Sequence, residues 1–117
     1  MSLMGIDIGT SGCKAAAFSD KGECYGIVYR EYSVIRTGNM TAELDSIFVW
    51  NKLKEVIREA AAKAGKDTVT AVCVSSLGEA VIPVSANREI LGNSILSSDI
   101  RGQKYIDKFP LNSEEFY

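Results

Sequence analysis

The sequence predicts an α/β domain in which helices pack on a mixed β-sheet. Three observations support this class. Three β-type segments at the N-terminus are joined by short turns, one amphipathic helix follows, and a further apolar β-type segment comes after the helix. Strands joined by short turns must run antiparallel, whereas a strand that follows a crossover helix can return parallel. The chain is therefore expected to form one domain of order β-β-β-α-β, with shorter elements behind it.

Alternation of apolar and polar residues, together with turn chemistry, defines the first three strands. The second and third are joined by Asp20-Lys21-Gly22-Glu23, in which Gly22 can adopt the positive φ that a hairpin turn requires. Short connections of this kind make the three strands an antiparallel meander. We expect the strands at residues 3–8, 14–19 and 24–34.

An amphipathic helix is expected over residues 46–64, behind a polar surface loop at residues 37–44. Asp45 is a suitable N-cap, and Gly65 is a suitable stop signal. The charged side chains of residues 52–63 are expected to form a solvated face. Apolar residues recur at helical spacing and are expected to form the buried face. These residues are Trp50, Leu53, Ile57, Ala60, Ala61 and Ala64.

The region after the helix is expected to complete the sheet. Residues 69–75 form a near-continuous run of β-forming apolar residues, which predicts a central strand covered on both faces. A proline near the end of the chain is expected to close a final helix. These later elements are short strands at residues 80–84 and 95–96, a turn at residues 87–89, and a helix at residues 99–108 closed by Phe109-Pro110.

Composition limits the chemistry available to this chain. Its 117 residues fit one domain, and its net charge of −2 argues against a nucleic-acid surface. No apolar run approaches the length of a membrane span. The absence of histidine removes Ser-His and Cys-His nucleophiles and most zinc sites. Cys13, Cys24 and Cys73 are widely spaced, which suits reduced thiols in a cytoplasmic protein and disfavours a three-cysteine zinc site. Residues 1–3 are interpreted as a vector-derived leader, which leaves the domain at residues 4–117.

The most informative segment is the turn that joins the first two strands. Asp7 lies in an apolar strand, where a carboxylate is costly unless it faces an open cleft. Gly9 permits close backbone approach, and Thr10 and Ser11 supply amide and hydroxyl donors. Lys14 can neutralise phosphate charge, and Asp7 can order the water shell of Mg²⁺. The segment is therefore expected to bind phosphates, and a plain hairpin with a surface lysine is the alternative.

Three further segments accompany this turn in sequence order. They are residues 42–45 (Ala-Glu-Leu-Asp), residues 74–80 (Val-Ser-Ser-Leu-Gly-Glu-Ala), and residues 83–91 followed by Ser98-Asp99-Ile100-Arg101. Together with residues 7–14, which match Asp-x-Gly-Thr-(Thr/Ser)-x-x-Lys, they resemble the N-terminal region of the FGGY carbohydrate kinases. The resemblance covers nearly the whole chain, and it implies a ribonuclease-H-like, actin-type ATPase fold.

The same resemblance implies which residues bind the substrate. Glu79 follows a strand, where a carboxylate can accept hydrogen bonds from sugar hydroxyls. Asp99 and Arg101 could grip hydroxyls as well, or pair with each other at a helix start. Xylulokinases resemble this chain less at residues 77–79, where they have Gln-Met-His, and the Gly-Glu pair here is nearer to the Arg-Glu of glycerol kinases. Ser97-Ser98 replaces the aromatic residue that usually precedes Asp-x-Arg. The implied substrate-binding residues are Ser76, Gly78, Glu79, Asp99 and Arg101.

The resemblance implies that the full-length protein phosphorylates a sugar or polyol hydroxyl with ATP and Mg²⁺, between two domains that close over a cleft. In that family the general base, the second phosphate motif and the adenosine pocket lie in later sequence. We therefore expect this chain to be inactive alone, to need a C-terminal domain of the same polypeptide, and to expose apolar surface that could form a homodimer. The alternatives are a non-catalytic sugar-binding or assembly module, and another ATPase of the same superfold, such as an acetate-kinase-like or chaperone-type domain.

Overall fold

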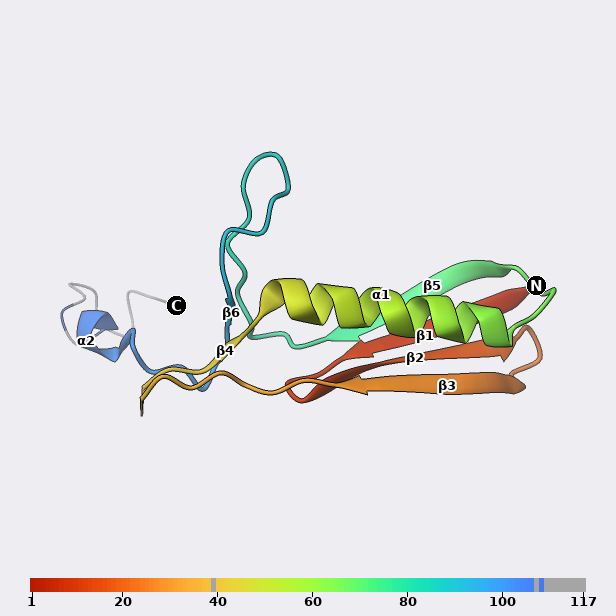
Figure 1. The fold of residues 1–117 in the computed structure, drawn as a ribbon, viewed down its shortest axis with the longest axis horizontal. Helices are drawn as coiled ribbons and strands as arrows, with labels where there is room; N and C mark the ends of the chain where they lie inside the picture. Colours follow the sequence, from red (N-terminus) through yellow and green to blue (C-terminus); the bar gives the residue numbers. More distant parts are fainter. Residues whose placement is uncertain (39, 107, 109–117) are drawn as a thin grey trace, which may run out of the picture.

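The structure is a computed structural model that describes residues 1–38, 40–106 and 108. A four-stranded mixed sheet forms the body of the molecule, and one long helix lies along one face of it (Figure 1). The predicted α/β class is therefore confirmed. In chain order the elements are β1 (Ser2–Ile8), β2 (Gly12–Ser19), β3 (Cys24–Glu31), β4 (Glu43–Leu44), α1 (Ser46–Lys63), β5 (Val69–Ser76), β6 (Ser94–Ile95) and α2 (Gln103–Ile106).

The first three strands form the predicted antiparallel meander. β1 pairs with β2, β2 pairs with β3, and β5 returns parallel to β1, so the strand order is β3-β2-β1-β5. The turn after β2 places Gly22 at a φ of 87°, as its turn chemistry requires. β1 begins at Ser2, so Ser2 and Leu3, which we interpreted as leader residues, are its first residues.

The hydrophobic core lies between α1 and the sheet. α1 packs mainly on β2 and β3, and the side chains of Leu53, Val56 and Ala60 are buried there. Register partners on neighbouring strands share a face, so Ile6 of β1 and Ala15 of β2 both point toward the helix. The buried cluster comprises Met4, Ile6, Cys13, Ala15, Val28, Tyr32, Ala42, Leu44, Leu53, Val56, Ala60 and Leu96.

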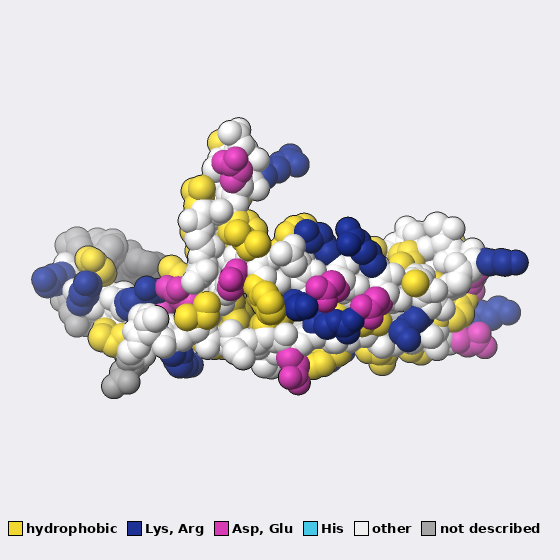
Figure 2. Space-filling model, viewed as in Figure 1, with side chains coloured by type: hydrophobic (Ala, Val, Ile, Leu, Met, Phe, Trp, Pro, Cys, Tyr) yellow, Lys and Arg dark blue, Asp and Glu magenta, His cyan; other side chains and the backbone are white. Residues whose placement is uncertain are grey.

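The outer side of α1 carries charges of both signs, as its sequence pattern predicts (Figure 2). Lys52 pairs with Glu55 at 3.0 Å. Arg30 of β3 reaches Glu55 at 3.4 Å and also pairs with Glu59. Ion pairs with this much solvent exposure add little to stability, so these side chains mainly keep the outer face of the helix hydrated.

The N-terminus of α1 is capped as predicted. The carboxylate of Asp45 accepts a hydrogen bond from the Phe48 N–H at 2.9 Å, which satisfies one of the free amides of the first turn. We expect Asp45→Ala to lower the free energy of unfolding by about 0.5–2 kcal/mol. Urea denaturation followed by circular dichroism measures this effect. Asp45→Asn keeps a capping oxygen and is the matched control, and equal stability of both variants would contradict the capping role.

β5 is an edge strand, and the prediction of a central strand covered on both faces is wrong. Among the described residues its partner strand is β1, and residues 70–76 are exposed. The side chains of Val72 and Val74 are 56% and 57% exposed. The apolar run identified a β-strand but not its burial, because α1 packs mainly on β2 and β3, and the described part of the chain contains no element that covers β5.

Trp50 also differs from the prediction, because it is 52% exposed and does not belong to the core. Helical periodicity places Trp50 on the same side as Leu53 and Ala60, which are buried as predicted. The first turns of α1 extend beyond the end of β3 (Figure 1), so residues there have less sheet beneath them. Periodicity gives the direction of a side chain but not the extent of the surface that it faces.

Between β5 and β6 the chain projects away from the sheet as an arm (Figure 1). Isolated bridges join Val84 to Ile90 and Val81 to Ile95, so the expected strand at residues 80–84 is present only as single bridges. The turn that we expected at residues 87–89 is present, with Arg88 at a φ of 66°.

The remaining elements are shorter than, or different from, those predicted. The loop that we expected at residues 37–44 ends in β4, which pairs with β6. α2 occupies only part of the helix predicted at residues 99–108, while Phe109 and Pro110 lie outside the described residues. In the part of the chain that the structure describes, none of the helices has both the length and the apolarity needed to cross a bilayer.

Candidate functional site

The turn between β1 and β2 is fixed in place by hydrogen bonds to its carbonyl groups. The Gly9 N–H donates to the Gly12 carbonyl at 2.9 Å and closes the turn. From the end of β3, the Tyr32 hydroxyl donates to the Gly9 carbonyl at 2.7 Å, and the Tyr32 N–H donates to the Ser11 carbonyl at 3.1 Å. Thr10 and Ser11 are exposed at the tip of the turn. The predicted phosphate-binding residues therefore form a defined surface feature.

Asp7 and Lys14 lie opposite each other on the face of the sheet that α1 does not cover. They are register partners on β1 and β2, and the Lys14 Nζ is 3.6 Å from an Asp7 carboxylate oxygen. The side chains are 49% exposed at Lys14 and 56% exposed at Asp7. They line a shallow hollow of about 300 Å³ together with Cys73 and Ser75 of β5. One anionic and one cationic group are thus available beside the turn formed by Gly9, Thr10 and Ser11, which we call the phosphate turn after its predicted role.

A second hollow, of about 270 Å³, lies between the phosphate turn and the loop after β5. Thr10 lines it from the turn, Gly78 and Glu79 line it from the loop, and Ser97 closes it from the segment after β6. The Leu77 N–H donates to the Ile8 carbonyl at 3.2 Å, which ties the loop to the end of β1. We call this hollow the turn–loop hollow.

The turn–loop hollow is at the carboxyl ends of two parallel strands, β1 and β5. In open α/β sheets, ligand sites lie at this edge. The arrangement brings a donor-rich turn and the carboxylate of Glu79 to the same space, so it can hold a molecule that carries both a phosphate and hydroxyl groups.

Ser76, another predicted substrate-binding residue, faces a different space. It lines an apolar hollow of about 320 Å³ beneath the arm, together with Trp50 and Ile82. Ser46 lines the same hollow, and its buried hydroxyl has no hydrogen-bond partner among the described residues. The structure therefore separates Ser76 from Gly78 and Glu79, although the three are close in sequence.

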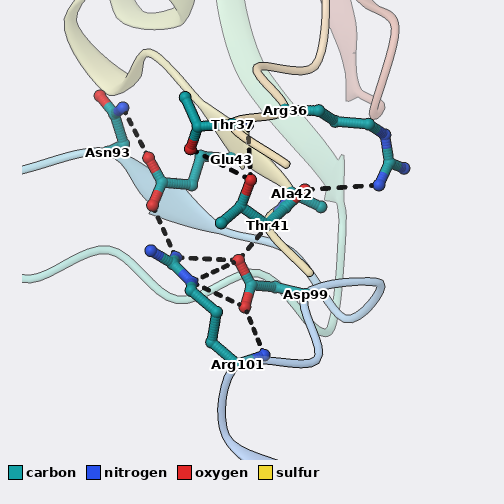
Figure 3. A network of polar contacts seen from close by, with 8 residues as sticks. All are labelled: Arg36, Thr37, Thr41, Ala42, Glu43, Asn93, Asp99 and Arg101. Carbon is teal, nitrogen blue, oxygen red and sulfur yellow. Dashed lines mark hydrogen bonds and ion pairs between the residues drawn. The ribbon is translucent and has the colours of Figure 1, made fainter. Parts of the chain in front are cut away.

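Asp99 and Arg101 pair with each other, which is the structural alternative that the sequence left open (Figure 3). The Arg101 Nη2 lies 2.8 Å from one Asp99 oxygen, and the Asp99 side chain is only 3% exposed. The same guanidinium donates to Glu43 at 2.6 Å, and Asn93 donates to Glu43 at 2.9 Å. The Ala42 N–H donates to Asp99 at 2.9 Å. This Glu43–Asp99–Arg101 network joins β4 to the segment that follows β6.

Hydrogen bonds from Arg101, and then from the Ala42 N–H, lower the pKa of Asp99 to about 2. The Asn93 amide and then the Arg101 guanidinium lower the pKa of Glu43. Both groups are therefore held as carboxylates. The neighbouring loop adds its own contacts, because the Thr37 N–H donates to the Thr41 hydroxyl at 2.6 Å (Figure 3).

We expect Asp99→Asn to lower the melting temperature by several degrees, because it weakens the Arg101 pair in a buried position. The pKa of Asp99 in the folded state, about 2, is below its ordinary 3.8. Its contribution to stability is therefore complete above about pH 4 and is lost as the pH falls from about 4 toward 2. Thermal denaturation between pH 2 and pH 7 measures both effects.

The matched control for that measurement is Asp20→Asn, at an exposed position of the β2–β3 turn. The difference in melting temperature between the wild-type chain and Asp99→Asn should narrow below pH 4. A difference that is constant across the whole pH range would contradict the assignment.

Asp7 is the carboxylate available to a divalent cation beside the turn between β1 and β2. Mg²⁺ in phosphoryl-transfer sites is held by one or two carboxylates, with substrate phosphates and waters completing its octahedron. Asp7 is a half-exposed carboxylate beside the turn and fits this role. No group of three or more Cys, Asp or Glu side chains with the geometry of a metal site occurs among residues 1–38, 40–106 and 108, so a site held by the protein alone is not formed there.

Two residues of the site region were not identified from the sequence. Tyr32 contacts the phosphate turn, but it follows the third strand and carries no motif. Glu43 lies in the segment at residues 42–45 that contributed to the family resemblance, but its pairing with Arg101 spans 58 residues. The sequence contained the residue types but no signal for these two contacts.

The FGGY family of carbohydrate kinases, N-terminal domain, has a family model that matches residues 2–115. A probable L-xylulose kinase from Haemophilus influenzae is 29% identical over 105 residues, which cover 88% of this chain and 22% of that protein.

Solved structures of similar fold come from several kinases. Xylulose kinase from Rhodospirillum rubrum has a TM-score of 0.87 and 23% identity, covering 99% of this chain and 25% of that one. Ligand-bound xylulose kinase from Lactobacillus acidophilus has a TM-score of 0.82 and 24% identity, covering 92% and 22%. Plasmodium falciparum glycerol kinase with ADP has a TM-score of 0.81 and 20% identity, covering 97% and 24%. The predicted ribonuclease-H-like, actin-type ATPase fold is confirmed, and the chain spans only about a fifth to a quarter of these relatives.

Proposed function

Because this chain belongs to the FGGY family of carbohydrate kinases, as the N-terminal domain, we propose that the full-length protein transfers the γ-phosphoryl group of ATP to a hydroxyl of a sugar or polyol. The observation that carries the proposal is the turn–loop hollow. It combines Thr10 of the phosphate turn with Glu79 at the carboxyl edge of the sheet. A kinase needs its phosphate donor and its hydroxyl acceptor at one place, and these two residues offer both kinds of contact.

Each residue of the turn is proposed to make a different contact with ATP. Gly9 allows the backbone to approach the phosphates, and Thr10 and Ser11 donate hydrogen bonds to phosphate oxygens. Lys14 adds positive charge to the same face of the sheet, 3.6 Å from Asp7. Phosphoryl transfer depends mainly on positioning and on neutralising charge, so these contacts account for this chain's share of catalysis.

Asp7 is the residue that would hold Mg²⁺, through water. The bound cation neutralises negative charge on the phosphates. Asp7 is well suited because it is half exposed and because Lys14, its ion-pair partner, has a flexible side chain that can move to a phosphate.

Glu79 and Gly78 are proposed to contact the acceptor. The Glu79 carboxylate accepts hydrogen bonds from hydroxyl groups, which favours a neutral sugar or polyol over a sugar acid. Asp99 and Arg101 are proposed to support this site indirectly. Their network holds in place the segment that includes Ser97, which lines the turn–loop hollow.

The 117-residue chain alone is proposed to lack activity. The family resemblance assigns the general base and the adenosine pocket to later sequence, and a small ligand is normally buried over most of its surface. The hollows beside the turn, of about 300 and 270 Å³, are expected to cover only part of a nucleotide. The C-terminal domain of the same polypeptide is the proposed partner.

The test is a thermal-shift panel of polyols, pentoses, hexoses and sugar acids on the full-length protein, with and without MgATP, followed by an assay for ADP release. We expect one class of neutral sugar or polyol to raise the melting temperature and to support ADP formation. The 117-residue chain should give no sugar-dependent ADP. If a sugar binds but no acceptor yields ADP, a non-catalytic sugar-binding module replaces the kinase.

A further inference from the structure

Tyr32 contacts the phosphate turn, although it belongs to none of the motifs found in the sequence. It follows β3 directly, is only 7% exposed, and is the largest side chain of the core next to the turn. Its hydroxyl and its N–H donate to the carbonyls of Gly9 and Ser11, at 2.7 and 3.1 Å. One residue therefore holds both ends of the three-residue turn.

These contacts determine which groups of the turn remain free. The carbonyl oxygens of Gly9 and Ser11 are occupied by Tyr32, on the core side of the turn. The N–H groups of Thr10 and Ser11 donate to no acceptor within the described part of the chain. A phosphate is repelled by carbonyl oxygens and attracted by N–H groups, so this arrangement suits an approaching anion.

The hydroxyl of Tyr32 remains a donor over the physiological pH range. Burial, and then the neighbouring Cys13, Asp7 and Tyr29, raise the pKa of Tyr32 to about 12. A phenolate would repel the Gly9 carbonyl, but with a pKa of about 12 the Tyr32 hydroxyl keeps its proton at neutral pH.

We propose that Tyr32 is a positioning residue for nucleotide binding, which holds the Gly9–Ser11 turn so that the Thr10 and Ser11 N–H groups face the phosphates. This inference rests on the proposed kinase function and deepens it. Tyr32 is 7% exposed, and both of its hydrogen bonds to the turn are accepted by carbonyl groups, so it acts through the turn.

Tyr29 and Tyr25 provide the comparison. The Tyr29 hydroxyl is also near the turn, but it lies 3.4 Å from the Ser11 carbonyl and its side chain is exposed. The Tyr25 hydroxyl donates to Asp67, at the other end of the sheet. Tyr29→Phe therefore removes a long contact with the turn, and Tyr25→Phe removes a tyrosine hydrogen bond that does not touch it.

The test is made on the full-length protein with Tyr32→Phe, which keeps the ring and removes only the hydroxyl. We expect the Kd for MgADP and the KM for ATP to rise roughly 3- to 10-fold, the usual effect of one lost hydrogen bond. The KM for the acceptor sugar should change less than about twofold, since its contacts are elsewhere. Tyr25→Phe should leave the Kd for MgADP close to the wild-type value, and Tyr29→Phe should raise it less than Tyr32→Phe does.

Amide hydrogen exchange gives a readout that needs no activity. In Tyr32→Phe the Gly9 N–H, which closes the turn on Gly12, should exchange faster than in Tyr25→Phe of matched melting temperature. If Tyr32 has a purely structural role, Tyr32→Phe will have a lower melting temperature, but its nucleotide affinity and its rate of Gly9 exchange will match those of Tyr25→Phe. That result would overturn the inference. Failure of the wild-type protein to bind MgADP or MgATP would instead overturn the proposed function, and the role of Tyr32 with it.

Discussion

Asp7→Asn is expected to lower the kcat of the full-length kinase by roughly 10²- to 10³-fold, because it removes the carboxylate beside the phosphate turn while keeping the size of the side chain. The substitution should lower the Mg²⁺-dependent kcat and leave the affinity for the sugar unchanged. Steady-state kinetics over a range of Mg²⁺ concentrations measure it. If Asp7→Asn needs a higher Mg²⁺ concentration to reach half of its maximal rate, Asp7 is a residue that holds the metal.

Asp20→Asn is the control for this variant, because it removes the same charge at the far end of β2, in an exposed turn. It should retain wild-type kcat. Unchanged kcat in Asp7→Asn, measured on folded protein, would contradict the assignment of Asp7 and reopen the possibility of a plain hairpin.

Glu79→Gln is expected to raise the KM for the acceptor sugar roughly 10- to 100-fold, since hydrogen bonds to a charged group contribute about 1.5–3 kcal/mol. The KM for ATP should stay near its wild-type value, because Glu79 lies on the loop side of the turn–loop hollow. Kinetics with each substrate varied in turn, together with sugar binding in the absence of nucleotide, separate the two effects.

Glu89→Gln is the matched control, because Glu89 is an exposed glutamate of the arm and its partner there is Ser85. It should leave both KM values unchanged. A Glu79→Gln variant with wild-type sugar affinity would show that the loop after β5 does not contact the acceptor.

The parts of the fold that were predicted correctly depend on local signals. Alternation and the turn at Gly22 specify the meander, and Asp45 specifies the start of α1 through its own hydrogen bond to Phe48. These interactions connect residues that are close in sequence, so the sequence contains both partners. The exposure of Trp50 and Val74 was missed because it depends on which elements lie next to them in space.

In the candidate site, too, the sequence indicated some residues and gave no signal for others. The motif located Asp7 and Lys14, and the register of β1 and β2 explains why they meet. The sequence offered two roles for Asp99 and Arg101, and the structure shows the pairing of the two side chains together with the contact between Asp99 and Ala42. The role of Tyr32 could not be predicted, since a tyrosine that follows a strand has no characteristic spacing to the turn that it contacts.

The Glu43–Asp99–Arg101 network has a consequence for the order in which the domain folds. Its contacts join residues 57 and 58 positions apart, with α1, β5 and the arm between them. Long-range contacts of this kind close large loops and tend to form late, after the meander and helix. Asp99→Asn should therefore accelerate unfolding in stopped-flow denaturant jumps and leave the refolding rate nearly unchanged. The segment that carries Ser97, like the loop after β5 whose Leu77 N–H donates to Ile8, would then take shape late. A newly made chain therefore acquires its phosphate turn before it acquires the opposite walls of the turn–loop hollow.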